Sequence, residues 1–165
     1  MFIKKVLPYL LALTILAVVA WFYKAYKMVP SLPVYDHELI NEQGNKIKIS
    51  DLKGHYVLIS YFQTWCGTCA KELPGIDALQ MSIGKDKLSV LIVSDEPEEK
   101  ILRFKERFCN TLDYYRTDKP LIDLGIRVFP TTYLLNKKGE VILSNLDAFD
   151  WNSEEVKKAI IDSER

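Results

Sequence analysis

Residues Phe62 to Pro74 read FQTWCGTCAKELP and place two cysteines, Cys66 and Cys69, two residues apart. Only one other cysteine, Cys109, occurs among the 165 residues, so at most one disulfide can form within the chain. A pair of this kind can be a structural disulfide, half of a metal site or a redox switch. The sequence around the pair distinguishes these possibilities.

The pair lies between an expected strand and an expected helix. Tyr56 to Phe62 (YVLISYF) is nearly continuous in apolarity, which is typical of a strand buried on both faces. A helix is expected from about Gly67 to Ile83, and Pro74 inside it predicts a kink. At such a helix start the backbone N–H groups and the helix dipole favour a thiolate, and they lower the pKa of a cysteine from about 8.5 to as little as about 3.5. Cys66 is therefore suited to attack a disulfide, and Cys69, one turn later, to resolve the mixed disulfide.

The other uses of the pair have less support. A zinc site needs four ligands, and the chain offers no second pair of cysteines and no paired histidines. A loop this short removes little entropy from the unfolded chain, which argues against a purely structural disulfide. A thiol-based copper carrier stays open, because soft thiolates bind Cu(I). Cys109 is interpreted as a small buried residue on an apolar helix face.

Length and charge limit the remaining function classes. The chain has 165 residues, enough for one domain and an appendage, and 48% of them are hydrophobic. Lys and Arg together number 22, as do Asp and Glu, so the formal net charge is zero. No basic field indicates nucleic-acid binding, and three cysteines cannot form a disulfide-dense scaffold.

The N-terminal segment has a different composition. Val6 to Tyr23 contains no charge and is rich in Leu, Val and Ala, and a spanning helix needs roughly 17–25 apolar residues. We therefore predict a membrane anchor over residues 1–26, with a cleaved signal peptide or a buried helix as the alternatives. The lysines on the two sides are tied in number, but we expect the short N-terminal tail inside and the domain outside, where disulfides persist.

A linker and one globular domain are expected after the anchor. Residues 27–33 form the linker and 34–165 the domain. Periodicity and turn residues predict strands at 34–40, 46–49, 88–94, 131–135 and 140–143. They also predict helices at 98–109, 120–124 and 153–161, with Ser153 as an N-cap. Strands that alternate with helices, followed by a late hairpin, indicate an α/β domain with a mixed sheet and helices on both faces.

Several motifs together resemble the thioredoxin-like superfamily. Trp65-Cys66-Gly67-Thr68-Cys69 after a strand is similar to the thioredoxin active site. The wider pattern is similar to the membrane-anchored TlpA/ResA-like branch, and its features are SDLKG at 50–54, KELP at 71–74, and FPTTYLL at 129–135 followed by KGE at 138–140. The resemblance covers roughly residues 33–165 and implies a thioredoxin-like fold.

The resemblance also implies roles for individual residues. Cys66 would be the exposed attacking cysteine and Cys69 the buried resolving one, and the two would form the redox disulfide. Pro130 would be a cis-proline that faces the dithiol, and the backbone of Phe129 would pair with a bound substrate peptide. Trp65, Gly67 and Thr68 would complete the substrate-binding surface, with Trp65 shielding the site.

Two departures from thioredoxin bear on the chemistry. The buried aspartate that thioredoxin carries six residues before its first cysteine is Ser60 here. Glu72, three residues after Cys69, matches the glutamate of the ResA-like branch, and burial would raise the pKa of its carboxyl so that it could take the Cys69 proton. Thr68 replaces thioredoxin's proline between the cysteines, which affects the reduction potential.

Peroxiredoxins are excluded because Gln63 and Ile59 stand where their motif has threonine and proline.

The expected function is therefore that of a membrane-tethered protein thiol–disulfide oxidoreductase. The resemblance implies a bacterial cytoplasmic membrane, a catalytic domain on the extracytoplasmic side and a membrane thiol-reducing electron donor. Its substrates would be disulfides of exported proteins, apocytochrome c among them, with a role in cytochrome c biogenesis. No bound cofactor or metal is needed. The same dithiol could instead work as an oxidase or isomerase, since direction depends on potential and partner.

Overall fold

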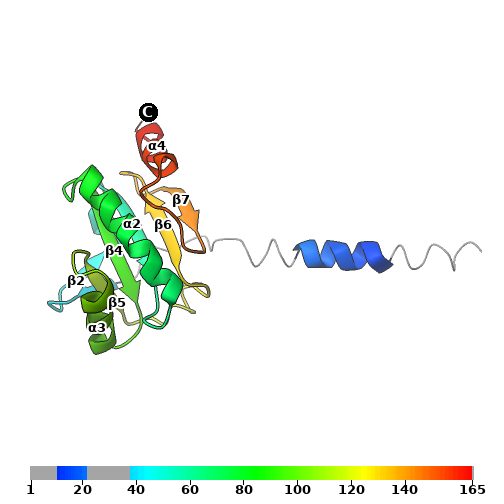
Figure 1. The fold of residues 1–165 in the computed structure, drawn as a ribbon, viewed down its shortest axis with the longest axis horizontal. Helices are drawn as coiled ribbons and strands as arrows, with labels where there is room; N and C mark the ends of the chain where they lie inside the picture. The colour runs from blue at the N-terminus through cyan, green and yellow to red at the C-terminus, as the bar shows by residue number, and fades with distance from the viewer. Residues whose placement is uncertain (1–10, 22–37, 165) are drawn as a thin grey trace, which may run out of the picture.

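The computed structural model describes residues 11–21 and 38–164. Within 38–164, seven strands form one mixed sheet in the order β2-β1-β5-β4-β3-β6-β7 (Figure 1). The central strands β4 and β3 are parallel, as are β5 and β4, and the other neighbours are antiparallel. The predicted linker at 27–33 and the first residues of the predicted domain, 34–37, lie outside the described residues.

The strands follow the apolar runs of the sequence. Their bounds are Glu38–Asn41 for β1, Lys46–Lys48 for β2, Tyr56–Tyr61 for β3, Leu88–Ser94 for β4, Tyr114–Thr117 for β5, Thr131–Leu135 for β6 and Val141–Asn145 for β7. Every residue of β3 is buried, which agrees with the prediction of a strand covered on both faces. Successive side chains of a strand point to opposite faces. Leu58 accordingly packs in one hydrophobic cluster and Ile59 in the other.

The three α-helices of the domain lie on one face of the sheet, not on both faces as the strand–helix alternation predicted. The helices of the domain are η1 (Ile49–Leu52, a 3-10 helix), α2 (Gly67–Ile83), α3 (Glu98–Phe108) and α4 (Glu154–Asp162). Buried residues of α2, α3 and α4 share a single cluster with Leu58 and Leu134 of the sheet. The opposite face is covered by η1 and by the irregular segment between β5 and β6, which contributes Leu121 and Ile126.

Two local predictions need correction, and a third, Ser153 as the N-cap of α4, is confirmed in position. The helix predicted at 120–124 is a series of turns, in which Ile126 N donates to Leu121 O and the N–H of Leu121 donates to Asp95 Oδ2 instead of starting a helix. Ser153 does take the N-cap position of α4, but its side chain makes no capping hydrogen bond. Cys109 lies just after α3 instead of within it, and it is half-buried with its Sγ 3.2 Å from Thr111 Oγ1.

Residues 11–21 form a separate helix within the predicted anchor (Figure 1). Its large apolar side chains are exposed, for example Leu13 at 65% and Leu16 at 67%. Of the helices in the described part of the chain, none has the length and apolarity that crossing a membrane requires. The predicted anchor extends over residues 1–10 and 22–26, which are not described.

Candidate active site

The two cysteines lie at the junction of β3 and α2 and form a disulfide. Cys66 is the N-cap of α2, where its N–H donates to Gln63 O, and its Sγ accepts the backbone N–H of Cys69 at 3.1 Å. Their Cα atoms are 5.3 Å apart. The helix N-terminus thus places a backbone donor against the sulfur that would carry the thiolate charge after reduction.

Both sulfurs are enclosed in this disulfide form. Cys66 is 5% exposed and Cys69 is 1% exposed, so the exposed attacking cysteine that the resemblance implied is absent from this state. The reason is geometric, because the bond to Cys69 holds the Cys66 sulfur against the start of the helix. Gly67 and Thr68 between them are exposed, and Thr68 Oγ1 lies 3.6 Å from Cys66 Sγ.

A cis-proline stands at the same end of the sheet. The Phe129–Pro130 peptide bond is cis, as the resemblance implied, and Pro130 directly precedes β6. Thr131 of β6 pairs with Tyr61, the last residue of β3, so Pro130 lies beside the loop that leads to Cys66. Trp65 is 71% exposed, and its ring meets that of Phe129 edge-to-face with centroids 5.9 Å apart. Trp65 and Phe129 therefore form an aromatic pair at the surface of the site.

Glu72 is more deeply buried than the sequence suggested. It is 2% exposed on the inner face of α2. Its Oε1 accepts hydrogen bonds from Ser60 Oγ at 2.7 Å and Thr132 Oγ1 at 2.9 Å, and its Oε2 accepts one from Trp151 Nε1 at 3.0 Å. Burial raises the pKa of the Glu72 carboxyl, although these three bonds favour the ionised form and oppose the rise.

Sequence reasoning missed the partners of Glu72. Ser60 was noted only as a missing aspartate, Thr132 only as part of a motif, and Trp151 not at all. One signal was available, because Ser60 interrupts an otherwise apolar strand and a buried hydroxyl needs a partner. Its hydroxyl also lies 2.9 Å from Thr132 Oγ1, so β3, β6 and α2 meet in one polar cluster.

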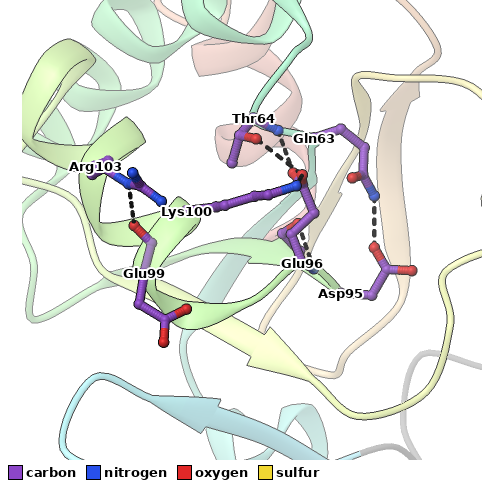
Figure 2. A network of polar contacts seen from close by, with 8 residues as sticks. Gln63, Thr64, Asp95, Glu96, Glu99, Lys100 and Arg103 are labelled. Carbon is purple, nitrogen blue, oxygen red and sulfur yellow. Dashed lines mark hydrogen bonds and ion pairs between the residues drawn. The ribbon is translucent and has the colours of Figure 1, made fainter.

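Two acidic residues, Asp95 and Glu96, accept hydrogen bonds from the loop before the cysteines, as Figure 2 shows. Glu96, in the loop between β4 and α3, accepts the Thr64 N–H at 2.5 Å and the Thr64 hydroxyl at 3.0 Å. Asp95 accepts Gln63 Nε2 at 2.6 Å through one oxygen and the Leu121 N–H at 2.8 Å through the other. These carboxylates therefore fix the backbone two residues before Cys66.

No metal centre is evident in the part of the chain that the structure describes. Within residues 11–21 and 38–164, no group of three or more His, Cys, Asp or Glu side chains is arranged to hold a metal ion.

Solved structures of other proteins share this fold. A thiol:disulfide interchange protein from Bacteroides sp. superposes with a TM-score of 0.68 at 22% identity, covering 81% of this chain and 91% of that one. A putative thiol:disulfide interchange protein DsbE from Chlorobium tepidum gives a TM-score of 0.66 at 20% identity, covering 81% and 99%. The fold, with its Cys-x-x-Cys pair between a strand and a helix, defines a thioredoxin-like protein.

Sequence comparison gives the family. A model of the AhpC/TSA family matches residues 30–144, and the chain belongs to that family. It is 34% identical over 111 residues to the thioredoxin-like protein YneN of Bacillus subtilis (strain 168), which covers 64% of this chain and 65% of that protein. It is 32% identical over 109 residues to the thiol-disulfide oxidoreductase ResA of Geobacillus kaustophilus (strain HTA426), covering 64% and 63%. The chain thus spans a little under two thirds of the length of these curated relatives.

Proposed function

We propose that this protein is a membrane-tethered thiol–disulfide oxidoreductase that reduces disulfides in exported proteins. The observation that carries the proposal is the Cys66–Cys69 disulfide at the N-terminus of α2. It lies at the same end of the sheet as the cis-proline Pro130. Similarity to relatives named thiol-disulfide oxidoreductase supports the same reaction.

The reaction begins from the reduced dithiol. The Cys66 thiolate attacks one sulfur of a substrate disulfide, so that an S–S bond forms between Cys66 and the substrate while the second substrate sulfur leaves as a thiolate. Cys69 then loses its proton and attacks Cys66 Sγ, which closes the Cys66–Cys69 disulfide and releases the first substrate sulfur. Two electrons pass from the protein to the substrate, and a thiol-reducing donor must return them.

Glu72 is the proposed acceptor of the Cys69 proton. It lies one helical turn after Cys69 on α2, and its buried carboxyl has a raised pKa, as a group that exchanges protons near neutral pH needs. The pH dependence of Cys69 alkylation is the test, measured in the reduced protein and in Glu72→Gln. A profile that is the same in both proteins would remove Glu72 from the mechanism.

The substrate chain is proposed to lie along Phe129 as an added strand. Trp65 and Phe129 would bracket it, and the exposed Gly67 and Thr68 leave its path to Cys66 open. Reduction requires the Cys66 sulfur to become accessible once the disulfide opens.

Reduction potential decides the direction of the reaction. The full-length protein in detergent is equilibrated with dithiothreitol or glutathione buffers, and the disulfide fraction is followed by alkylation. A potential of about −270 mV or lower supports a reductase, whereas a value near about −120 mV would make it an oxidant of exported proteins.

Cys66→Ser should abolish disulfide reduction. Retained Cu(I) without reductase activity would instead favour a copper carrier.

The membrane tether rests on residues 6–23 and on the exposed apolar side chains of the helix at 11–21. An orientation with the domain outside the cytoplasmic membrane would place the dithiol where exported disulfides occur. Full-length protein should stay with the membrane fraction after alkaline washing, and Leu13→Asp/Leu16→Asp should release it while the reductase activity remains. Release of the unmodified protein by the wash would end this part of the proposal.

A further inference from the structure

A groove runs between α3 and the loop that leads to the cysteines. Its volume is about 220 Å³, and its lining residues are Thr64, Lys100, Arg103, Phe104, Arg107 and Phe108. Thr64 stands two residues before Cys66, so the Cα atoms of the two are at most about 7.6 Å apart. From Lys100 to Phe108 the helix extends the groove by about 12 Å. The groove is thus continuous with the surroundings of the dithiol.

Two of the three cations in the groove form no ion pair with a described residue. Arg103 donates its Nε–H to the backbone oxygen of Glu99 at 3.1 Å, and Arg107 lies over the Phe108 ring at 5.1 Å from its centroid. Neither guanidinium takes part in an ion pair with any residue in the described ranges. Lys100 approaches Glu96 only at 3.5 Å and keeps 54% of its side chain exposed.

Glu96, the carboxylate that contacts Lys100, is already held by the active-site loop. Both oxygens of Glu96 accept hydrogen bonds from Thr64, as Figure 2 shows. The Glu96 side chain is 10% exposed. The opposite side of α3 is different, because Lys105 there is paired with Glu42 of the β1–β2 turn. On this helix, Lys105 and Lys100 are each within ion-pair distance of a carboxylate, whereas Arg103 and Arg107 in the groove form no ion pair with a described residue.

Aromatic rings give the groove an apolar part. Phe104 is 4% exposed and its ring packs, tilted by 48°, against that of Phe108 with centroids 4.7 Å apart, and Phe108 itself is 42% exposed. An exposed ring that lies against a guanidinium group, with a second arginine in the same groove, suits a ligand that combines negative charge with an apolar side chain.

We propose that this basic-aromatic groove binds an acidic segment of the substrate polypeptide, within a few residues of the disulfide that Cys66 attacks. The inference rests on the proposed oxidoreductase function and names a substrate class for it. A polypeptide is favoured over anionic lipid because the groove is continuous with the active-site loop, so a chain whose cysteine reaches Cys66 passes its flanking residues over α3. Complementary charge would raise the encounter rate and select among exported disulfides.

The test compares two peptide disulfides that are identical except that one carries Asp and Glu beside its cysteine and the other Asn and Gln. Reduced full-length protein should reduce the acidic peptide with a kcat/KM about tenfold higher at low salt, and the preference should fade near 1 M salt, where the screening length is about 3 Å. Arg103→Glu/Arg107→Glu should abolish this preference for the acidic peptide.

The control variant carries the same change of net charge elsewhere. Lys53→Glu/Lys158→Glu alters two exposed lysines outside the groove and should keep the preference. Binding of serine analogues of both peptides to the oxidised protein is measured in parallel, which tests the groove without turnover.

Each outcome has one meaning. Equal kcat/KM and equal binding for the two peptides in the unmodified protein would overturn the groove inference alone. Reduction of neither peptide would overturn the proposed function, while the serine analogues would still decide the inference. Loss of binding to vesicles containing anionic lipid in Arg103→Glu/Arg107→Glu, with the peptide preference intact, would assign the groove to lipid and overturn the proposal.

Discussion

Glu72 of α2 and Glu96 of the loop after β4 are both carboxylates near the cysteines, in sequence or in space. Their environments are opposite. Glu72 is buried among neutral donors from three different elements, Ser60, Thr132 and Trp151. Glu96 is half-buried at the surface, where it accepts hydrogen bonds from the backbone and the side chain of Thr64 and lies 3.5 Å from Lys100 Nζ. Burial raises the pKa of Glu72, which prepares it to exchange a proton.

The difference separates two tasks. A carboxyl that changes protonation needs a site where charge is costly, and such a site also makes it costly to remove. A carboxylate that fixes a loop needs donors on that loop, and Thr64 supplies two of them to Glu96. Glu72 is therefore expected to govern proton transfer and stability, and Glu96 the geometry in front of Cys66.

Glu72→Ala should have the largest effect on the free energy of unfolding. A smaller effect than those of the variants below would contradict the comparison of the two carboxylates. The change leaves a cavity and removes the acceptor of three buried donors, so we expect a loss of about 3 kcal/mol in the free energy of unfolding. Glu72→Gln keeps the shape and one acceptor oxygen and should lose about 1 kcal/mol or less. Urea denaturation of the oxidised protein measures both, and equal losses would mean that the polar cluster contributes little.

Trp151→Phe should come next. It removes the indole N–H that Glu72 Oε2 accepts, and it reduces the filling of a position that is 0% exposed, at a cost of about 1–3 kcal/mol. Since that bond lowers the pKa of Glu72, its loss should raise the pKa further, which NMR titration of the carboxyl detects. Phe149→Leu removes the neighbouring ring without touching the bond, and it should leave the titration unchanged.

The pH dependence of stability sharpens the comparison further. The folded pKa of Glu72 is raised above its ordinary value of 4.5, so the folded state holds a proton that the unfolded chain releases. Stability due to this group is therefore fully present below about pH 4.5 and is lost as pH rises through the folded pKa. The unfolding free energy of the unmodified protein, relative to that of Glu72→Gln, should therefore fall as the pH rises from about 4.5 through the folded pKa of Glu72. A constant difference from pH 4 to 8 would contradict the raised pKa.

Glu96→Gln should have the smallest effect on stability. An amide has only one acceptor oxygen, so one of the two bonds that Thr64 donates must be lost or reversed, with Thr64 Oγ1 accepting from the amide N–H, at a cost of up to about 1 kcal/mol. We expect kcat/KM for disulfide reduction to fall severalfold, with no change in the pH profile. Glu99→Gln is the matched control, because the structure uses only the backbone oxygen of Glu99. A shifted pH profile in Glu96→Gln would place Glu96 with Glu72 in proton transfer.

Local pattern predicted the parts of the fold that depend on local physics. The apolar run at β3, the helix at Gly67–Ile83 and the strand at Leu88–Ser94 were all expected, because burial and backbone hydrogen bonding act over neighbouring residues. The short strand β5 was missed. Its four residues are stabilised by pairing with β1 and β4, and neither partner is adjacent in sequence.

The sequence by itself determined the chemistry of the site: a dithiol at the start of a helix, a glutamate one turn later and a proline about sixty residues on. Only the tertiary structure decided the surroundings of these groups. Ser60, Thr132 and Trp151 converge on Glu72 from up to 79 residues away, and α2, α3 and α4 pack on one face of the sheet. The physical reason is that hydrogen-bond satisfaction and packing are properties of the whole core, and a chain position alone does not reveal which distant side chain will meet it.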